Sequence, residues 1–507
     1  MVLLGCAGVV GLWTIYFACV TISIPYPLEY RESASQVMTQ YLLEGRNPYG
    51  LENQPMAMDS YGIVYSLLVL PLAALFGNTL LIHRVVTLVF QLLCSLLVGL
   101  MGFRWSKSAG AAIAFGVLNG MVLGARGGLG AFPSAVGAFF FLSALIVPFL
   151  RTFDRRGLVF SALLSLVAFY SKPYFLLSFP IVASYLFIFE SKRKAVFHGL
   201  VFAVMACASF LLVRALLPVY FIYTIGNNLS NAMRDRPWLY YQLEQLGREF
   251  YPSVVLAAIL LVAGVLSLEW RTAKPREMLS SSNLLSLERP LVSKPLNYFA
   301  YAFGCSALVF VLLLGQNNGS WMLYGYQLMM PPFFLWMASV FKPLSRMALI
   351  GIPLLVLNLF LFARARYNPE FLQQRNSMDW ARLYAYADSS RHILNTPLIA
   401  SEMLRLGMWP VDSGRNSFWG LKPYPDNALL GPSYAVVLRA WGGYQDSIQA
   451  SVMSRQYDRI ITVRDTDFFK AHNLRTYYHE VETLDVTMPQ TDQVWTVEIW
   501  EPNAGGG

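Results

Sequence analysis

Long apolar segments separated by short polar loops make up the first 363 residues of the chain. Runs long enough, or nearly long enough, to span a bilayer lie at 2–24, 84–103, 109–125, 130–150, 157–171, 174–189, 196–218, 252–268, 297–315, 327–341 and 346–363. A bilayer core about 30 Å thick needs roughly 20 apolar residues of helix to cross it. A further apolar stretch, at 61–77, contains Pro71 and ends at Gly77. The pattern predicts an α-helical polytopic membrane protein.

The pattern changes after residue 363. Strand-like runs appear at 397–402, 457–464 and 494–500, and helical periodicity appears at 376–394 and 444–456. Alternating helices and strands indicate a small α/β layer, and about 140 residues are enough to bury a core. We therefore expect a transmembrane domain at 1–363 and a soluble α/β domain at 364–507.

Composition places the basic character in the membrane part. The chain is 56% hydrophobic and 13% charged, whereas soluble domains carry about 25% charged residues. An ordinary soluble enzyme and a disordered or fibrous chain are therefore excluded. Residues 1–363 hold 24 Lys and Arg against 13 Asp and Glu, while residues 364–507 hold 14 against 16. A basic excess confined to apolar sequence indicates membrane topology and not nucleic-acid binding. The five cysteines lie in apolar runs and predict no disulfide framework.

The positions of the basic residues predict the transmembrane topology. With the N-terminus inside and 61–77 not spanning, 15 of the 24 basic residues fall in inside loops. Because cytoplasmic loops carry the Lys and Arg excess, we predict about eleven spanning helices, with 61–77 as a short helix in the outer leaflet. The run at 2–24 lacks a basic leader and a cleavage site, so it is interpreted as a retained first helix. Loops 25–60 and 219–250 and the C-terminal domain then lie outside.

The first outer loop holds the densest group of ionisable residues at the membrane boundary. Glu29 and Glu32 lie three residues apart, close to Arg31. A carboxylate at the bilayer edge can act as a general base toward a hydroxyl. The alternative is that the two acids only solvate the end of the first helix.

Four short motifs follow one another in this region. They are the pair Glu29 and Glu32, the Leu42-x-x-Gly45-x-x-Pro48-Tyr49 segment, Tyr61-Gly62 before the apolar stretch, and Arg84 at the start of the next span. In this order they resemble the GT-C glycosyltransferases, multi-spanning enzymes that use polyprenyl-phosphate-linked sugars. Within that group the chain is most similar to the bacterial protein-mannosyltransferase-like and aminoarabinose-transferase-like branch. The resemblance is best over residues 1–190 and is topological elsewhere.

The resemblance implies a GT-C-like fold of about 11–13 helices with an active site at the outer face of a bacterial inner membrane. The first-loop acid of the family, usually an Asp, is its catalytic base, which makes Glu29 and Glu32 the catalytic candidates. A Glu stands at 29 in place of the Asp, so which carboxylate acts is open. The second outer loop has Arg126 but lacks the acid that many relatives carry there. This departure weakens the case for a metal bridging two carboxylates. A divalent metal is thus left open but not indicated by the sequence, and the cofactor is unknown.

The departing phosphate of such a donor carries charge that needs fixed cations. The candidates are Arg84, Arg126, Lys172, Arg234 and Arg236. Lys172, in Ser171-Lys172-Pro173-Tyr174, resembles a recurrent Lys of the family. Interfacial snorkelling is an equal alternative for Lys172 and Arg126, and a solvated surface is the alternative for Arg234 and Arg236.

Aromatic residues and one acid are expected to line the cleft for sugar and lipid. They are Tyr49, Asp59, Tyr61, Tyr324 and Tyr326. An interfacial aromatic belt is the alternative for the last two. The C-terminal domain has no phosphate loop, nucleophile elbow or zinc spacing, so we expect it to bind the acceptor or shape the cleft.

The sequence thus favours an inverting glycosyltransferase that moves a sugar from a polyprenyl phosphate to a lipid, glycan or protein acceptor. Its partners are then the lipid-linked sugar, that acceptor and the membrane, with no nucleic acid. The alternatives are a lipid-linked-sugar transporter or flippase and a polysaccharide polymerase. A transporter would place ionisable groups near the bilayer midplane, whereas this chain gathers its charges at one face. The acid pair in the first loop argues against the polymerase.

Overall fold

The computed structural model describes residues 2–53, 61–124, 128–226, 236–248, 251, 255, 258, 294–316, 322–340, 348–366, 377–412, 432–464, 474–488 and 494–503. The helices of the first half are α1 (Val2–Ile22), α2 (Glu32–Leu43), α3 (Val64–Phe76), α4 (Leu80–Ser106), α5 (Ala109–Leu123), α6 (Ser134–Leu150), α7 (Arg155–Ser171), α8 (Ser178–Tyr185) and α9 (Lys192–Leu216). They are followed by α12 (Lys294–Val309), α13 (Met322–Val340) and α14 (Ala348–Arg366). Each predicted span that falls on described residues coincides with a helical segment, and the span at 252–268 lies largely outside them.

Local signals start several of these helices. The side-chain oxygens of Thr79, Ser108 and Asp154 accept N–H groups in the first turns of α4, α5 and α7. Such caps satisfy donors that the start of a helix leaves without a partner. Because polar caps stand directly before apolar runs, the sequence pattern alone locates the helix starts well.

The apolar helices fall into two length groups. In the described part of the chain, four helical segments are long and apolar enough to cross a membrane: α1, α4, Pro173–Glu190 and α9. The shorter apolar helices include α3, α5 and α6, with 13, 15 and 17 residues. At 13 residues α3 is about 20 Å long, less than a bilayer core of about 30 Å, and its placement in the outer leaflet stays a prediction.

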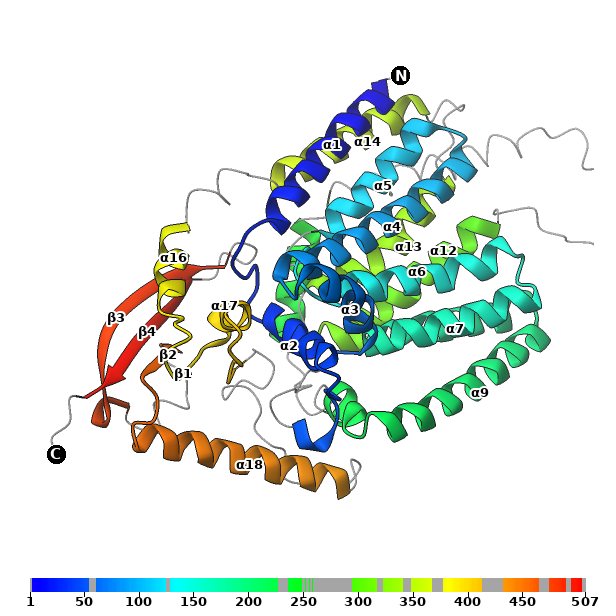
Figure 1. Ribbon diagram of the computed structural model, residues 1–507. Helices are drawn as coiled ribbons and strands as arrows, with labels where there is room; N and C mark the ends of the chain where they lie inside the picture. The colour runs from blue at the N-terminus through cyan, green and yellow to red at the C-terminus, as the bar shows by residue number, and fades with distance from the viewer. Residues whose placement is uncertain are drawn as a thin grey trace, which may run out of the picture.

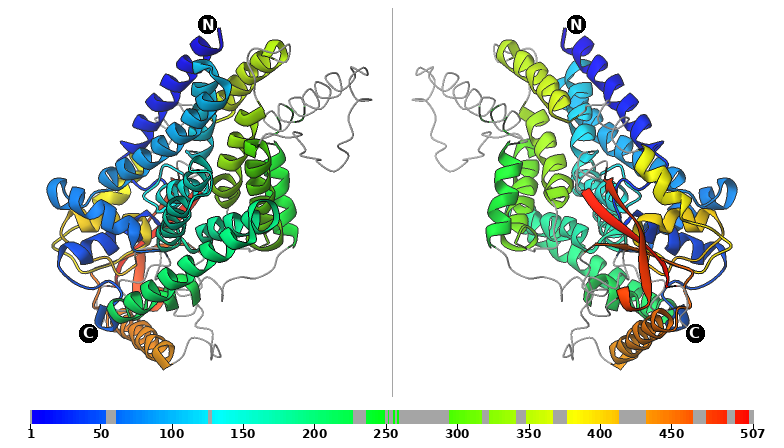
Figure 2. Two further views of the ribbon diagram at one scale, coloured as in Figure 1. Left: turned by 90° about the vertical axis from the view of Figure 1, so that its right-hand side faces the viewer. Right: turned by 90° about the vertical axis from the view of Figure 1, so that its left-hand side faces the viewer.

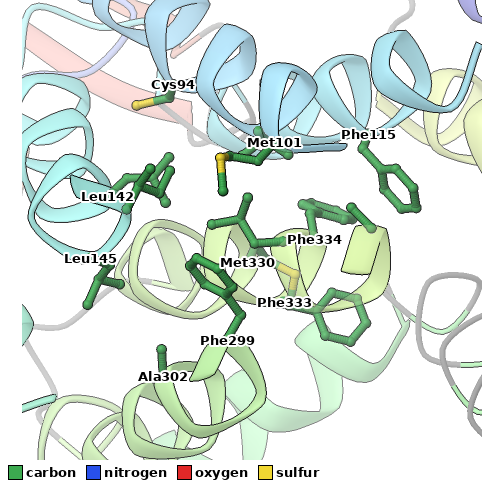
Figure 3. Close-up of a cluster of buried hydrophobic side chains, with 14 of the residues drawn as sticks. Cys94, Met101, Phe115, Leu142, Leu145, Phe299, Ala302, Met330, Phe333 and Phe334 are labelled. Carbon is green, nitrogen blue, oxygen red and sulfur yellow. The ribbon is translucent and has the colours of Figure 1, made fainter. Parts of the chain in front are cut away.

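The helices share one hydrophobic core. Met101 of α4, Leu142 of α6, Phe299 of α12 and Met330 and Phe334 of α13 are buried together in it (Figure 3). Flexible Met side chains and Phe rings fill the space between helices that are far apart in the sequence. This core fixes the helix ends that carry the polar residues of the connecting loops.

The C-terminal part carries a four-stranded sheet in the order β1-β2-β4-β3. β1 (Ile393–Leu394) is parallel to β2 (Arg459–Val463), while β4 (Val494–Pro502) is antiparallel to both β2 and β3 (Tyr478–Thr487). Three helices complete this part: α16 (Ser377–Ala385), α17 (Ala400–Arg405) and α18 (Pro432–Met453). A helical membrane protein with a small α/β sheet near its C-terminus is the fold class that the sequence predicts.

The strand predicted at 397–402 is wrong. These residues form a 3-10 turn, Pro397–Ile399, and the start of α17. Leu398, Ile399 and Ala400 are all fully buried, so the run lacks the burial alternation of a half-covered strand. The pattern also misses β3, because polar residues such as Glu480 and Glu482 obscure its period of two. The predicted strands at 457–464 and 494–500 correspond to β2 and β4.

The sheet lies at the end of α1 that is remote from the N-terminus, and α17 lies between it and α2 (Figure 1). In both views of Figure 2, the N-terminus and α18 lie at opposite ends of the molecule. Tyr26, which follows α1, is buried in the same hydrophobic cluster as Trp380 and Ile499 of the C-terminal part. The first loop and the C-terminal part therefore occupy the same end of the helices, which the sequence prediction assigns to the outer face.

Candidate active site

A buried ion pair holds the loop between α1 and α2. Glu32, the first residue of α2, accepts hydrogen bonds from Nε and Nη2 of Arg84 in α4, at 2.9 and 2.6 Å. Its two carboxylate oxygens also accept the backbone N–H groups of Leu28 (2.7 Å) and Ala131 (2.6 Å). Both side chains of the pair are 0% exposed. The bidentate pair therefore ties the first loop to α4, and Glu32 also ties it to the loop between α5 and α6.

The remaining N–H donors of Arg84 bond the backbone of the same loop. Its Nη1 and Nη2 groups donate to the carbonyl oxygens of Ile22, Ile24 and Tyr26, at 3.5, 2.5 and 2.8 Å. Together with the two bonds to Glu32, these contacts use all five N–H groups of a guanidinium. Arg84 and Glu32 are thus bonded to each other and to the backbone of the loops around them. The phosphate contact predicted for Arg84 and the role of base predicted for Glu32 stay predictions.

Glu29 lies in a different environment. It is 3% exposed, and its carboxylate accepts the Nε–H of Arg31 at 2.5 Å and the backbone N–H of Arg31 at 3.1 Å. Burial lowers the pKa of Arg31, but the Glu29 carboxylate and nearby tyrosines raise it by more. The pKa of Arg31 is therefore well above its ordinary value. Arg31 therefore stays charged, and Glu29 is a buried acid beside a permanent cation.

Lys172 is enclosed by aromatic rings. It directly follows α7, is 3% exposed, and its Nζ donates to the Oγ of Ser134 at 2.8 Å. The Nζ lies 4.5 Å from the ring centre of Tyr61, 4.9 Å from that of Tyr324 and 5.3 Å from that of Tyr174. Aromatic faces stabilise a desolvated ammonium group. The cage formed by Tyr61, Tyr174 and Tyr324 therefore keeps a positive charge in a nearly water-free position.

The Tyr61-Gly62 motif has a steric explanation. The Gly62 N–H donates to the carbonyl oxygen of Ser171, the residue before Lys172, at 3.1 Å. A Cβ on Gly62 would come 1.7 Å from the carbonyl oxygen of Tyr170, so only glycine permits this approach. Tyr49 supports the turn from behind, because its hydroxyl donates to the Tyr61 carbonyl oxygen at 2.8 Å. The motif thus places the Tyr61 ring against Lys172.

The Glu29–Arg31 pair and the lysine cage are neighbours. Tyr61 and Tyr324, whose ring centres lie 4.5 and 4.9 Å from the Lys172 Nζ, are also near enough to Arg31 to raise its pKa. We call Glu29, Arg31, Lys172 and the three tyrosines of the cage the polar cluster. A partly dry site with an excess of fixed positive charge is suited to an anion such as a phosphate.

The structure brings together part of the set predicted from the sequence. Glu29, Lys172, Tyr61 and Tyr324 share this cluster, whereas Tyr49 supports it and Tyr326 is buried in the helical core. Arg236 is exposed at the start of the helical residues 236–248. The remaining candidates lie outside the described residues: Asp59, Arg126 and Arg234.

Sequence reasoning missed three polar residues of the cluster. Ser134 bonds Lys172, and the Tyr174 hydroxyl donates to Oε1 of Gln327 at 2.7 Å. Tyr174 lies two residues after Lys172 and could have been found from its place in the motif. Ser134 and Gln327 are distant from this motif in the sequence, and only the folded structure brings them next to Lys172 and Tyr174. Within the described part of the chain, no group of three or more His, Cys, Asp or Glu residues could hold a metal ion.

Comparison with known proteins identifies the fold. No protein-family model and no curated protein matches the chain. Among solved structures, the chain is similar to ArnT from Cupriavidus metallidurans bound to undecaprenyl phosphate, with a TM-score of 0.63 and 12% identity over 99% of this chain and 98% of that one. It is also similar to ArnT from the same organism in the apo state, with a TM-score of 0.60 and 11% identity over 98% and 97% of the two chains. The chain therefore shares the fold of these ArnT structures, in agreement with the fold that the resemblance of the sequence motifs implies.

Proposed function

We propose that this protein is an inverting glycosyltransferase that moves a sugar from a polyprenyl phosphate to a hydroxyl of a lipid, glycan or protein acceptor. The observation that carries the proposal is the cluster in which buried Glu29 lies with Arg31 and the caged Lys172. Support comes from the fold, because a structure of the same fold over nearly the full chain binds undecaprenyl phosphate.

The proposed reaction is a single displacement. The acceptor oxygen attacks the anomeric carbon and forms the new glycosidic bond, while the bond from that carbon to the phosphate oxygen breaks. Glu29 accepts the proton of the acceptor hydroxyl, and the polyprenyl phosphate leaves with the electron pair. Lys172 and Arg31 face the phosphate, whose negative charge grows as the bond breaks, so they lower the energy of the transition state.

The other residues support this step. The tyrosine cage keeps water from Lys172, which strengthens its interaction with a phosphate in a medium of low dielectric constant. Glu32 and Arg84 hold the loop that carries Glu29, so we assign them to positioning. We further propose that the cluster faces the outer side of a bacterial inner membrane, where the polyprenyl tail remains in the bilayer and the acceptor arrives from water.

The test measures transfer from labelled polyprenyl-phosphate sugars, with isolated membranes and a panel of donors and acceptors. Glu29→Gln should abolish transfer and leave folding intact, because the amide keeps the shape of the side chain but cannot accept the proton. Glu44→Gln is the matched control, since Glu44 pairs with Arg46 two residues later in the same loop but is exposed at the surface. It should retain transfer.

Full transfer by the Glu29→Gln protein would overturn the role of Glu29 as base. Absence of transfer by the wild-type protein with every donor, in membranes that support a known enzyme of this class, would overturn the proposed function. Running the panel with and without a chelator shows whether a divalent cation takes part.

A further inference from the structure

The loop that carries Glu29 packs against the C-terminal part through two aromatic contacts. The Tyr26 ring stacks on Trp380 of α16, with centroids 5.1 Å apart and an interplanar angle of 2°. The Tyr30 ring contacts Trp495 of β4 at 5.2 Å and 39°. Tyr26 and Trp380 are buried in one hydrophobic cluster, and Tyr30 and Trp495 pack against it. The first loop therefore supplies side chains to the interior of the C-terminal part.

The opposite side of the same loop is held by the buried ion pair. The carbonyl oxygen of Tyr26 accepts a hydrogen bond from Arg84, while the Tyr26 ring stacks on Trp380. The backbone N–H of Leu28 donates to Glu32. The irregular segment between α1 and α2 is thus fixed from the membrane side by charge and from the C-terminal side by aromatic rings.

Tyr30 is the residue through which the second contact reaches the cluster. It lies in the chain between Glu29 and Arg31, and the guanidinium of Arg31 lies 5.2 Å from its ring centre. The ring therefore touches both Trp495 and the cation that pairs with Glu29. A shift of the Tyr30 ring would move the base and its neighbouring cation together.

We propose that Trp495 is a positioning residue for Glu29 and Arg31, so that the docked C-terminal part belongs to the working active site. This inference rests on the proposed function, because it takes Glu29 as the base. A displacement of about 1 Å at a reacting group can lower a rate by about 10²-fold. Loss of the Trp495 ring should therefore lower kcat more than it weakens donor binding. The caged Lys172 keeps its contact with the donor phosphate, while the displaced Glu29 and Arg31 act mainly in the transition state, where the phosphate charge grows.

A second aromatic contact between the same two parts provides a matched control. Tyr41, near the end of α2, contacts Trp409 with centroids 4.7 Å apart, and the guanidinium of Arg46 lies 4.2 and 5.4 Å from these two rings. The contact resembles the Tyr30–Trp495 contact in kind but does not adjoin Glu29 in the chain. Removing Trp409 weakens docking without touching the base.

The experiment compares steady-state kinetics of the full-length wild-type protein with three variants. Trp495→Ala should lower kcat by at least about tenfold with the donor KM changed less than twofold, whereas Trp409→Ala should keep kcat within twofold. Trp495→Phe should restore most of kcat. Its ring still contacts Tyr30, and the indole N–H that it removes is buried without a hydrogen-bond partner in the described part of the chain.

Wild-type kcat in Trp495→Ala, or an equal loss in Trp409→Ala, would overturn the inference while leaving the proposed function standing. Where Trp495→Ala fails to fold, Tyr30→Ala tests the contact from its other side, with the same expected split between kcat and KM. The effects of residues that act as a unit are not additive. The double variant that carries Trp495→Ala and Tyr30→Ala should therefore have about the same kcat as either single variant. A wild-type protein inactive with every donor would refute the proposed function itself, and with it the base that Trp495 is said to position.

Discussion

Lys172 owes its properties to residues from three separate segments. Lys172→Met keeps the length of the side chain inside the cage of Tyr61, Tyr174 and Tyr324 but removes its charge. A charge-assisted hydrogen bond contributes about 1.5–3 kcal/mol, so kcat/KM for the donor should fall by about 10- to 100-fold. The measurement is a donor titration at saturating acceptor. Lys192→Met, at an exposed position at the start of α9, serves as the control and should behave as wild type.

The Glu32–Arg84 pair makes a different prediction, about stability. Glu32→Gln leaves the Arg84 guanidinium buried without its counter-charge, and breaking a buried pair in this way costs about 3–5 kcal/mol. The thermal unfolding midpoint in detergent should therefore drop clearly. The control is Glu402→Gln, which removes a pair with a largely exposed Arg405 and should change stability by less than about 1 kcal/mol. Equal shifts in the two variants would contradict the holding role.

These two residues show how far sequence reasoning reaches at this scale. Lys172 and Arg84 look alike in the sequence, since each is a cation at the predicted outer boundary. One lies among tyrosines and the other is fully bonded to Glu32 and to backbone carbonyls. That difference depends largely on contacts between distant residues, such as Arg84 with Glu32, 52 positions apart, and Lys172 with Tyr61, which no local pattern contains. The sequence therefore identifies both cations as candidates. It cannot tell that Arg84 is fully bonded within the protein while Lys172 lies in the polar cluster.

At the scale of secondary-structure elements, the junction of Gly62 with the end of α7 should be intolerant of change. Gly62→Ala would place a methyl group against the Tyr170 carbonyl oxygen, which must displace Tyr61 from Lys172 or shift α7. We expect both lower thermal stability and loss of transfer. Gly199→Ala in α9 is the control, because nothing lies within 4 Å of its added Cβ. Replacing a helical Gly by Ala favours the helix by up to about 1 kcal/mol, so a loss in this variant would argue against the steric explanation.

The spanning helices were predictable because their signals are local. An apolar run of sufficient length behind a polar cap defines α4 and α9 without reference to the rest of the chain. The sheet is different, because β1 consists of two residues and exists only by pairing Ile393 with Arg459 and Leu394 with Ile460. Non-local pairing of this kind leaves too little periodicity for a sequence pattern to reveal.

At the scale of the whole molecule, the threading can be tested independently of any activity. Because the first loop and the C-terminal part lie at the same end of α1, an odd number of spans must connect them to the N-terminus. A reporter that becomes active only outside the cytoplasm should work when fused after residue 503 and fail when fused in the loop that contains Lys107. Activity in the second fusion and not in the first would invert the predicted orientation.

The Tyr30–Trp495 contact also bears on how the protein is made. These residues are separated by 465 positions in the chain, and ribosomes add about 5–20 residues per second. The loop with Glu29 therefore emerges and enters its membrane environment about 20–90 s before β4 is synthesised. During that interval the newly made loop can form its contacts with Arg84, Ala131 and Trp380 but not the contact with Trp495. If Trp495 positions the base as proposed, the nascent chain should not transfer sugar until β4 has docked. A biosynthetic delay of this kind would protect the lipid-linked donor from an enzyme that is still incomplete.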